Sequence, residues 1–188
     1  MLLITLIFVW IILILAFLLF VYLFLHLFVE LFFTLFKKYA PFVPTVTLIY
    51  RQEFEELFKF LESLNLENKK FVDLGSGDGV VVKKFAEKGY PSYGIEGNPF
   101  LFFLSKLGIK NKNAFFIRSD FFKEDLRNFG IVYVYQLTSI NQKLLPKLQE
   151  ELKSGSIIIA HKFPFFESEQ IKLIKKINGN TLLIYQKL

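Results

Sequence analysis

The sequence contains no cysteine, and no charged residue precedes Glu30. Without cysteine there can be no disulfide scaffold, no cysteine-ligated zinc and no thiol nucleophile, and we expect no metal site. Intrinsic disorder is also excluded, because 25 Phe and 8 Tyr supply abundant core material. The chain has 188 residues, which allows one ordinary domain and little more.

The charge-free stretch at the start of the chain has the length of a membrane span. Residues 2–29 would form a helix about 42 Å long, and a bilayer core of about 30 Å needs about 20 apolar residues. A cleaved signal peptide would have a basic start, a shorter apolar run and a small-residue cleavage site. A buried core helix is excluded because every face is apolar and the remaining chain is too small to surround it. The sequence therefore predicts a transmembrane anchor over residues 1–36.

The distribution of charge predicts the orientation of this anchor. No Lys or Arg precedes the span, whereas Lys37 and Lys38 follow it, so the positive-inside rule places the rest of the chain in the cytoplasm. Residues 37–188 carry all 23 basic residues and 16 of the 17 acidic ones, a formal charge of +7. A basic domain beside an anionic leaflet is attracted to it. No nucleic-acid-binding motif accompanies the lysines, so the expected partner is the lipid bilayer and not nucleic acid.

Residues 37–69 are expected to form a linker, punctuated by Pro41 and Pro44, followed by a helix over 51–64 before the main domain. From residue 70 onward, short apolar runs alternate with helical patterns. This alternation predicts a parallel sheet with helices on both faces. The expected strands are 70–74, 92–96, 114–118, 131–136 and 156–161, and the expected helices are 80–88, 98–107 and 141–153, with at most a short helix over 122–128.

The end of the chain has a different pattern. Residues 170–177 and 181–186 flank Asn178-Gly179, a dipeptide that favours a type I′ β-hairpin. The fold predicted for residues 70–188 is α/β: a Rossmann-like, doubly wound and mostly parallel seven-stranded sheet that ends in an antiparallel hairpin. One transmembrane helix precedes it.

The most informative segment is a glycine loop between the first strand and the first helix of this domain. Glycines allow a tight turn and close approach of the backbone to a ligand, and in an open parallel sheet this turn lies where ligands bind. Glu96 ends the second strand, where an acid can accept hydrogen bonds from both hydroxyls of a ribose. The loop reads Asp73, Leu74, Gly75, Ser76, Gly77, Asp78, Gly79.

Two cofactors compete for such a loop. A dinucleotide fingerprint has Gly or Ala at its sixth position. Counted from Gly75 as the first, that position is Val80 in this chain. Asp73 and Asp78 would also repel a pyrophosphate, but they suit a ligand with a cationic amino group. S-adenosylmethionine carries a sulfonium, an amino group and a ribose, and the loop N–H groups can bind its carboxylate. We therefore favour S-adenosyl-L-methionine over NAD.

These residues resemble the class I methyltransferase family over positions 70–188. Asp73–Gly79 matches the first motif of the family and Glu96 its second, and Asp120 lies where the family contacts the adenine amino group. The resemblance implies that the cofactor is bound by Asp73, Gly75, Ser76, Gly77, Asp78, Gly79, Glu96, Gly97, Asn98, Asp120 and Phe121.

A narrower resemblance is to the membrane-anchored protein-lysine methyltransferases, whose mitochondrial members modify the ATP synthase c subunit and the adenine nucleotide translocase. It is carried by the apolar helix, by Pro41-Phe42-Val43-Pro44-Thr45, by the glycine loop, and by Lys162-Phe163-Pro164-Phe165 after the fifth strand. The family often has a proline just after the fourth strand, where this chain has Gln136-Leu137-Thr138-Ser139. The resemblance implies that Thr45, Tyr135, Gln136, Phe163 and Pro164 border the active site.

Methyl transfer requires positioning and desolvation, not a nucleophilic residue of the enzyme. A lysine acceptor must be neutral, and deprotonation at pH 7.4 costs about 4 kcal/mol. Aromatic side chains around it would lower its pKa, although for each of them taken singly we favour ordinary core packing. His161 could act as a base, but we favour the simpler explanation of a polar residue that ends a strand. The aromatic candidates are Tyr135, Phe163, Phe165 and Phe166.

The sequence thus predicts a membrane-anchored methyltransferase that modifies a lysine of a membrane-associated protein. One alternative keeps the cofactor but changes the acceptor to a lipid or quinone-like molecule. Another is a non-catalytic membrane scaffold that binds S-adenosylmethionine.

Overall fold

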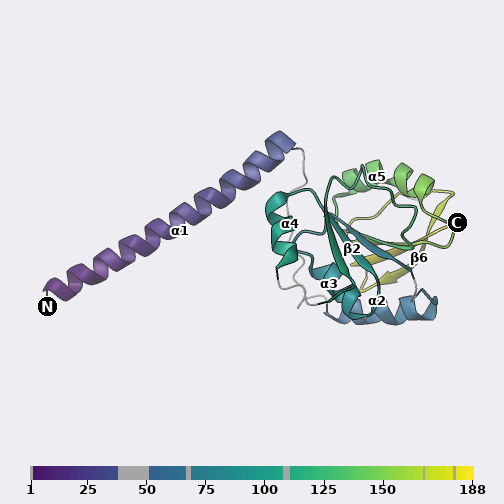
Figure 1. The fold of residues 1–188 in the computed structure, drawn as a ribbon, viewed down its shortest axis with the longest axis horizontal. Coiled ribbons are helices and arrows are strands. Elements are labelled where there is room, and N and C mark those ends of the chain that lie inside the picture. The colour runs from purple at the N-terminus through teal and green to yellow at the C-terminus, as the bar shows by residue number, and fades with distance from the viewer. Residues whose placement is uncertain (1, 38–50, 67–68, 108–110, 167, 180) are drawn as a thin grey trace. The chain divides into compact units, whose positions relative to one another are not determined.

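The computed structural model describes residues 2–37, 51–66, 69–107, 111–166, 168–179 and 181–188 (Figure 1). The chain divides into two compact units, residues 1–41 and 42–188. The linker prolines Pro41 and Pro44, and the predicted site residue Thr45, lie outside the described residues.

The first unit is one long helix, α1 (Leu2–Lys37). Its stretch from Leu6 to Leu31 has a mean hydropathy of 3.2, and none of this stretch is buried inside the protein. Length and composition therefore allow α1 to cross a membrane, as the sequence predicts.

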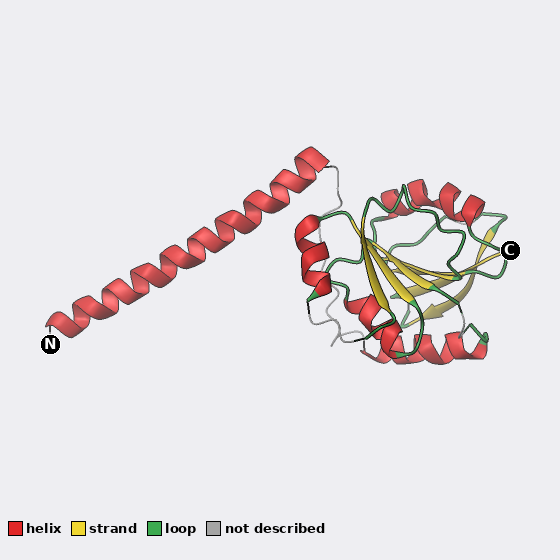
Figure 2. Ribbon diagram, viewed as in Figure 1, coloured by secondary structure: helices red, strands yellow, loops and turns green. Residues whose placement is uncertain are grey.

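The second unit is built on a seven-stranded sheet with the strand order β3-β2-β1-β4-β5-β7-β6 (Figure 2). Strands β1 to β5 pair in parallel, and β7 is antiparallel to both β5 and β6. This confirms the predicted parallel sheet with a closing hairpin. The strands are β1 (Phe71–Leu74), β2 (Ser92–Glu96), β3 (Ala114–Arg118), β4 (Ile131–Val134), β5 (Ile157–His161), β6 (Ile171–Ile177) and β7 (Leu182–Lys187).

Helices cover both faces of this sheet. On one face, α2 (Arg51–Ser63) and α3 (Val80–Glu87) enclose a core that includes Phe71 and Phe85. On the other face, α5 (Thr138–Glu151) buries Leu144 and Leu148 against the even-numbered residues of the central strands. The shorter α4 (Pro99–Lys106) contacts β2 and β3. The predicted doubly wound architecture is therefore present.

Helix α2 is packed into the domain. The apolar stripe predicted for it is buried: the side chains of Phe54, Leu57, Phe58 and Leu61 are at most 4% exposed. The ring of Phe58 meets Phe85 of α3 edge-on, with 4.9 Å between centroids. Each large apolar side chain buried in this way contributes about 1.5–3 kcal/mol, so α2 is an integral part of the core and not a peripheral segment.

The predicted closing hairpin forms, but its connection is longer than the two-residue loop of a type I′ hairpin. Ile177 pairs with Leu182, so four residues connect the strands where a type I′ turn has two. Two constraints fix this register. Residues 182–185 are buried in alternation on the two faces, and the Asn178 amide donates to Glu53 of α2 at 2.7 Å. Asn178 and Gly179 nevertheless have positive φ values, 47° and 67°, so the dipeptide keeps its local preference inside a longer connection.

Two further boundaries differ from prediction. Strand β4 ends at Val134, two residues before Gln136, the predicted end. Helix α5 begins at Thr138, three residues before the predicted start, because the carbonyl of Leu137 already accepts the first helical N–H groups. The connection from β3 to β4 contains turns and no helix, although Leu126 within it is fully buried. The N–H of Leu126 donates to Glu151 of α5 at 2.7 Å, which fastens the connection to that helix.

We predict that Leu57→Ala lowers the free energy of unfolding of the domain by about 2–5 kcal/mol, because it leaves a cavity under α2. Lys59→Ala, at an exposed position of the same helix, should change it by less than about 0.5 kcal/mol. Urea unfolding of the full chain in detergent, followed by near-ultraviolet circular dichroism of the core aromatics, measures both. Equal midpoints for the two variants would contradict the packing role of α2.

Candidate active site

The predicted glycine loop follows β1 at the carboxyl edge of the parallel strands. Gly75, Gly77 and Gly79 have φ values of 86°, 55° and 77°, a region that side-chain-bearing residues rarely adopt. Gly79 then starts α3 as its N-cap residue. Glycine is therefore needed at each of these three positions for the loop to fold back above β1.

The loop is fixed to the end of β2. The N–H groups of Gly75 and Ser76 both donate to the carbonyl of Ile95, at 2.9 and 3.1 Å. The Glu96 carboxylate accepts from the N–H of Gly77 at 2.8 Å and from the N–H of Asn98 at 2.7 Å. One carboxylate therefore holds together the glycine loop and the turn that leads into α4.

The turn after β2 also forms as predicted. The Asn98 side chain accepts from the N–H groups of Phe100 and Leu101, at 2.9 and 3.3 Å, and Pro99 is the first residue of α4. This N-cap fixes the direction of α4 and presents Gly97 and Asn98 next to Glu96.

Three carboxylates crowd this part of the edge. Burial raises the pKa of Asp73 well above its ordinary value, and Glu96 and Asp78 raise it further. Burial also raises the pKa of Glu96, although the hydrogen bonds from the Asn98, Gly77 and Gly97 backbone oppose this shift. A bound cation would relieve this repulsion, so the pKa shifts fit a ligand that carries positive charge.

The packing of a glycine and an aromatic ring under the loop was not predicted from the sequence. A Cβ built on Gly94, in the middle of β2, would lie 2.6 Å from the Ser76 hydroxyl and 2.8 Å from the Phe116 ring. Only a glycine at position 94 leaves room for Ser76 of the loop to lie this close to β2. The signal in the sequence was a lone glycine inside a strand, which often marks close approach of another backbone.

Other predicted residues gather around Gly75. The Gln136 amide donates to the Leu74 carbonyl at 3.3 Å, and a Cβ on Gly75 would meet Gln136 at 2.3 Å and the Phe121 ring at 4.0 Å. Asp120, half-buried after β3, accepts from the Phe122 N–H at 3.0 Å. The ends of β1, β3 and β4 thus converge on the loop.

A hydroxyl in the loop has no partner of its own. The Ser76 Oγ is buried and makes no hydrogen bond within the described part of the chain. A buried hydroxyl without a partner is costly, and a ligand polar group can satisfy it. The loop therefore has the chemistry of a binding site for S-adenosylmethionine: an unused hydroxyl, a buried carboxylate for a ribose and acids for a cation.

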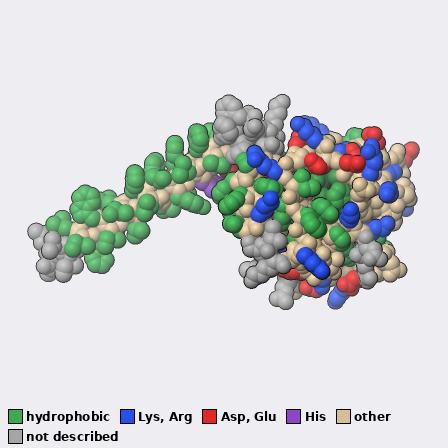
Figure 3. All heavy atoms as spheres, viewed as in Figure 1, with side chains coloured by type: hydrophobic (Ala, Val, Ile, Leu, Met, Phe, Trp, Pro, Cys, Tyr) green, Lys and Arg blue, Asp and Glu red, His purple; other side chains and the backbone are tan. Residues whose placement is uncertain are grey.

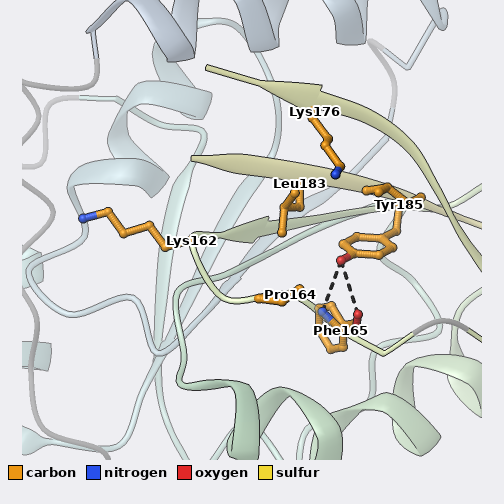
Figure 4. A pocket seen from close by; sticks show the side chains of 7 residues that line it. Lys162, Pro164, Phe165, Lys176, Leu183 and Tyr185 are labelled. Carbon is orange, nitrogen blue, oxygen red and sulfur yellow. Dashed lines mark hydrogen bonds between the residues drawn. The ribbon is translucent and has the colours of Figure 1, made fainter. Parts of the chain in front are cut away.

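Aromatic rings lie at the carboxyl ends of β4 and β5, next to the loop on the same edge of the sheet. Tyr135 stacks on His161 at 4.3 Å and on Phe163 at 5.9 Å, and Tyr133 is hydrogen-bonded to His161 Nδ1. Burial, with a smaller effect of Lys162, lowers the pKa of His161 to about 4, so the imidazole is neutral at physiological pH. Tyr135 and Phe163 are brought together, as expected for residues that border one site. Pro164 instead lines a cavity beside β7 (Figure 4).

Comparisons with known proteins assign this domain to a family. Residues 73–172 match the family model described as the ANTKMT methyltransferase domain. The chain belongs to this family. A lysine N-methyltransferase of Caenorhabditis elegans that is named for the ATP synthase c subunit is 34% identical over 148 residues, 73% of this chain and 74% of that protein. A protein-lysine N-methyltransferase of Saccharolobus islandicus is 30% identical over 152 residues, 76% of this chain and 88% of that protein.

A solved structure of a methyltransferase has a similar fold. The RNA methyltransferase of Salinibacter ruber in complex with S-adenosyl-L-homocysteine has a TM-score of 0.61 and 28% identity, over 77% of this chain and 92% of that one. The chain is thus a class I, S-adenosylmethionine-dependent methyltransferase. Its match spans between 51% and 58% of the length of the mammalian lysine N-methyltransferases that are named for the ATP synthase c subunit.

We predict that Gly94→Ala weakens binding of S-adenosylhomocysteine by about 5- to 150-fold, because overpacking under the loop costs about 1–3 kcal/mol. Gly155→Ala is the control: an added Cβ there meets nothing within 4 Å, and any strain from the positive φ of Gly155, 81°, falls on the turn before β5 and not on the loop. Titration calorimetry on the full chain in detergent measures both. Unchanged affinity in Gly94→Ala would disprove that this glycine sets the position of the loop.

We also predict that the affinity for S-adenosylmethionine rises with pH above the ordinary aspartate pKa of 3.8. The free protein holds a proton on Asp73 to a higher pH than usual, and a bound cation lowers that pKa, so binding releases protons. Asp73→Asn should flatten the rise, and S-adenosylhomocysteine, which lacks the sulfonium charge, should show a smaller one. Calorimetry in buffers of different ionisation enthalpy counts the protons. Proton uptake on binding would refute this assignment.

Proposed function

We propose that this methyltransferase is held at a membrane by α1 and methylates a lysine side chain of a membrane-associated protein. The observation that carries the proposal is the similarity to protein-lysine methyltransferases over a stretch that contains the whole glycine loop and the aromatic residues after β4 and β5. The relatives named for the ATP synthase c subunit support a membrane protein as the acceptor class.

The anchor explains how such an enzyme would find its acceptor. Leu, Ile, Phe and Val in the middle of a span each favour insertion by about 0.3–0.6 kcal/mol, and the stretch from Leu6 to Leu31 consists mostly of them. A tethered domain meets bilayer proteins at a raised effective concentration. Because Lys37 and Lys38 follow the span and no basic residue precedes it, the domain belongs on the cytoplasmic side.

The aromatic residues after β4 and β5 suit a lysine acceptor. A lysine ammonium must lose a proton before it can attack the methyl group, and apolar surroundings lower its pKa. Tyr135 and Phe163 are half-buried and supply such surroundings. Lys162 Nζ lies 5.9 Å from the Tyr135 ring centroid, and a fixed positive charge there would disfavour a second ammonium nearby.

Catalysis then consists of alignment. Glu96 and Asp73 would hold the cofactor through its ribose and cationic groups. The N–H groups of Gly75, Ser76 and Gly77 donate within the protein, so the Ser76 hydroxyl is the loop group that would bind the cofactor carboxylate. The reactive methyl is already activated by the sulfonium, so the protein contributes position, a neutral acceptor and exclusion of water. His161 is fully buried, packed against aromatic rings and uncharged at neutral pH, so it contributes to the shape of the site.

The test is transfer of an isotopically labelled methyl group. Membranes from cells that lack this gene are incubated with the full-length protein and methyl-labelled S-adenosylmethionine, and protein and lipid are then separated. We predict label in protein, at lysine, found by mass spectrometry as a shift of one or more methyl groups. Asp73→Asn should abolish transfer, whereas Asp125→Asn, at a side chain 55% exposed, should not change it.

Two other results would reject the proposal. Label confined to the lipid fraction would identify a lipid or quinone-like acceptor. Binding of the cofactor with no transfer to either fraction would identify a non-catalytic scaffold.

A further inference from the structure

Large apolar side chains surround the active-site edge of the sheet. The strands β2, β3, β4 and β5 are parallel, so their carboxyl ends lie at one edge, and an exposed apolar residue follows each of them. We call these four residues the apolar edge. They are Phe100, Phe122, Leu137 and Phe166, with exposed fractions of 58%, 38%, 45% and 64%.

The apolar edge lies on both sides of the glycine loop. In the strand order β3-β2-β1-β4-β5, the loop follows the central strand β1, Phe122 and Phe100 follow the two strands on one side, and Leu137 and Phe166 follow the two on the other. Beyond Phe100, an exposed apolar stripe continues at helical spacing through Phe103 of α4 to Leu107 at its end. Figure 3 shows hydrophobic side chains at the surface over α4, with Lys and Arg side chains beside them. Apolar side chains gathered around a site in this way mark an interaction surface.

The first turn of α2 lies at the same edge. The Asn178 amide in the β6–β7 connection donates to Glu53 in the first turn of α2, at 2.7 Å. Ile177 and His161 both pair with Leu182, so this connection lies level with the carboxyl end of β5. The first turn of α2, which the anchor segment precedes in the sequence, is therefore at the edge that carries the apolar residues.

Lysines accompany the apolar residues at this edge. Lys123 directly follows Phe122, and Lys162 directly follows β5. Lys162 and Lys176 also line a cavity of about 290 Å³ whose walls are largely apolar. Figure 4 shows the floor of this cavity, where the Tyr185 hydroxyl is hydrogen-bonded to the N–H and carbonyl of Phe165, at 3.2 and 3.4 Å. In Figure 4 the Lys176 ammonium points toward Tyr185, whereas the Lys162 ammonium points away from these residues and lies 5.9 Å from the Tyr135 ring centroid. A cationic group beside apolar walls, as Lys176 supplies, fits the phosphate and the upper chain of an anionic lipid.

We infer that the apolar edge rests on an anionic phospholipid bilayer, with its four side chains in the headgroup zone and the lysines at the phosphate level. This inference depends on the membrane anchoring proposed above. Apolar faces of interfacial proteins reach about 5–10 Å into the boundary between headgroups and acyl chains. The cofactor methyl group is then presented at the membrane surface, so the acceptor is a lysine at headgroup level and not one on a long extramembrane domain.

The natural absence of cysteine allows a direct test on the full chain. Phe100→Cys and Phe166→Cys are each labelled with an environment-sensitive fluorophore, in vesicles of phosphatidylcholine and phosphatidylserine. Leu188→Cys is the matched control, because Leu188 is 56% exposed but follows β7 at the opposite edge. We expect blue-shifted emission that lipid-bound nitroxides quench at positions 100 and 166, and emission that aqueous iodide quenches at 188.

Water-like emission at all three positions would overturn the inference. Lipid-like emission at all three would also overturn it, because the apolar edge would then not differ from the opposite edge, where Leu188 lies. Vesicle flotation and labelled methyl transfer are measured on the same samples. If the protein floats with vesicles and methylates lysine while positions 100 and 166 stay in water, the inference fails and the proposed function stands. If the protein does not float, the anchoring itself fails. Binding of S-adenosylhomocysteine shows that each labelled variant is folded.

Discussion

The active-site end of the domain depends on one buried carboxylate. Glu96 binds the N–H of Gly77 with one oxygen and the N–H of Asn98 with the other, and so joins two loops that follow different strands. A carboxylate offers about four acceptor positions, and these two bonds leave positions for the hydroxyls of a ribose. The same side chain can therefore assemble the loop before the cofactor arrives and bind the cofactor afterwards. The two backbone donors explain why burial of this carboxylate is tolerated, since they replace much of the lost hydration.

The carboxylate cluster also suits the site to a nucleoside ligand that carries positive charge. Glu96 and Asp78 lie close enough to Asp73 to raise the cost of placing a charge on it. A pyrophosphate would add negative charge to this cluster, whereas a sulfonium and an amino group subtract from it. Ligand preference is thus encoded in electrostatics that the bare geometry of a Rossmann-like turn does not supply, because the same turn in other proteins binds dinucleotides.

Local patterns predicted the elements whose causes are local. Asn98 followed by Pro99 specifies a helix start through its own side chain, and the glycine spacing specifies the loop through backbone angles. The four-residue hairpin connection was missed because it depends on Glu53, which is 125 positions away in the sequence. Gly94 was missed for a similar reason: its importance comes from Ser76 and Phe116, which reach it only in the folded sheet. Thr45 lies outside the described residues and remains a prediction.

The short connections of the domain bear on how it selects an acceptor. Within the described residues, the β3–β4 connection contains turns without a helix, and no helix follows β5 before β6. No added domain or long helix then covers the carboxyl edge in this part of the chain, which leaves Phe122 and Phe166 exposed beside the site. A soluble enzyme with this edge would carry a standing risk of aggregation. A domain held at a bilayer, as we propose, can expose it, because the membrane would supply both the cover for the apolar side chains and the place where the acceptor is found.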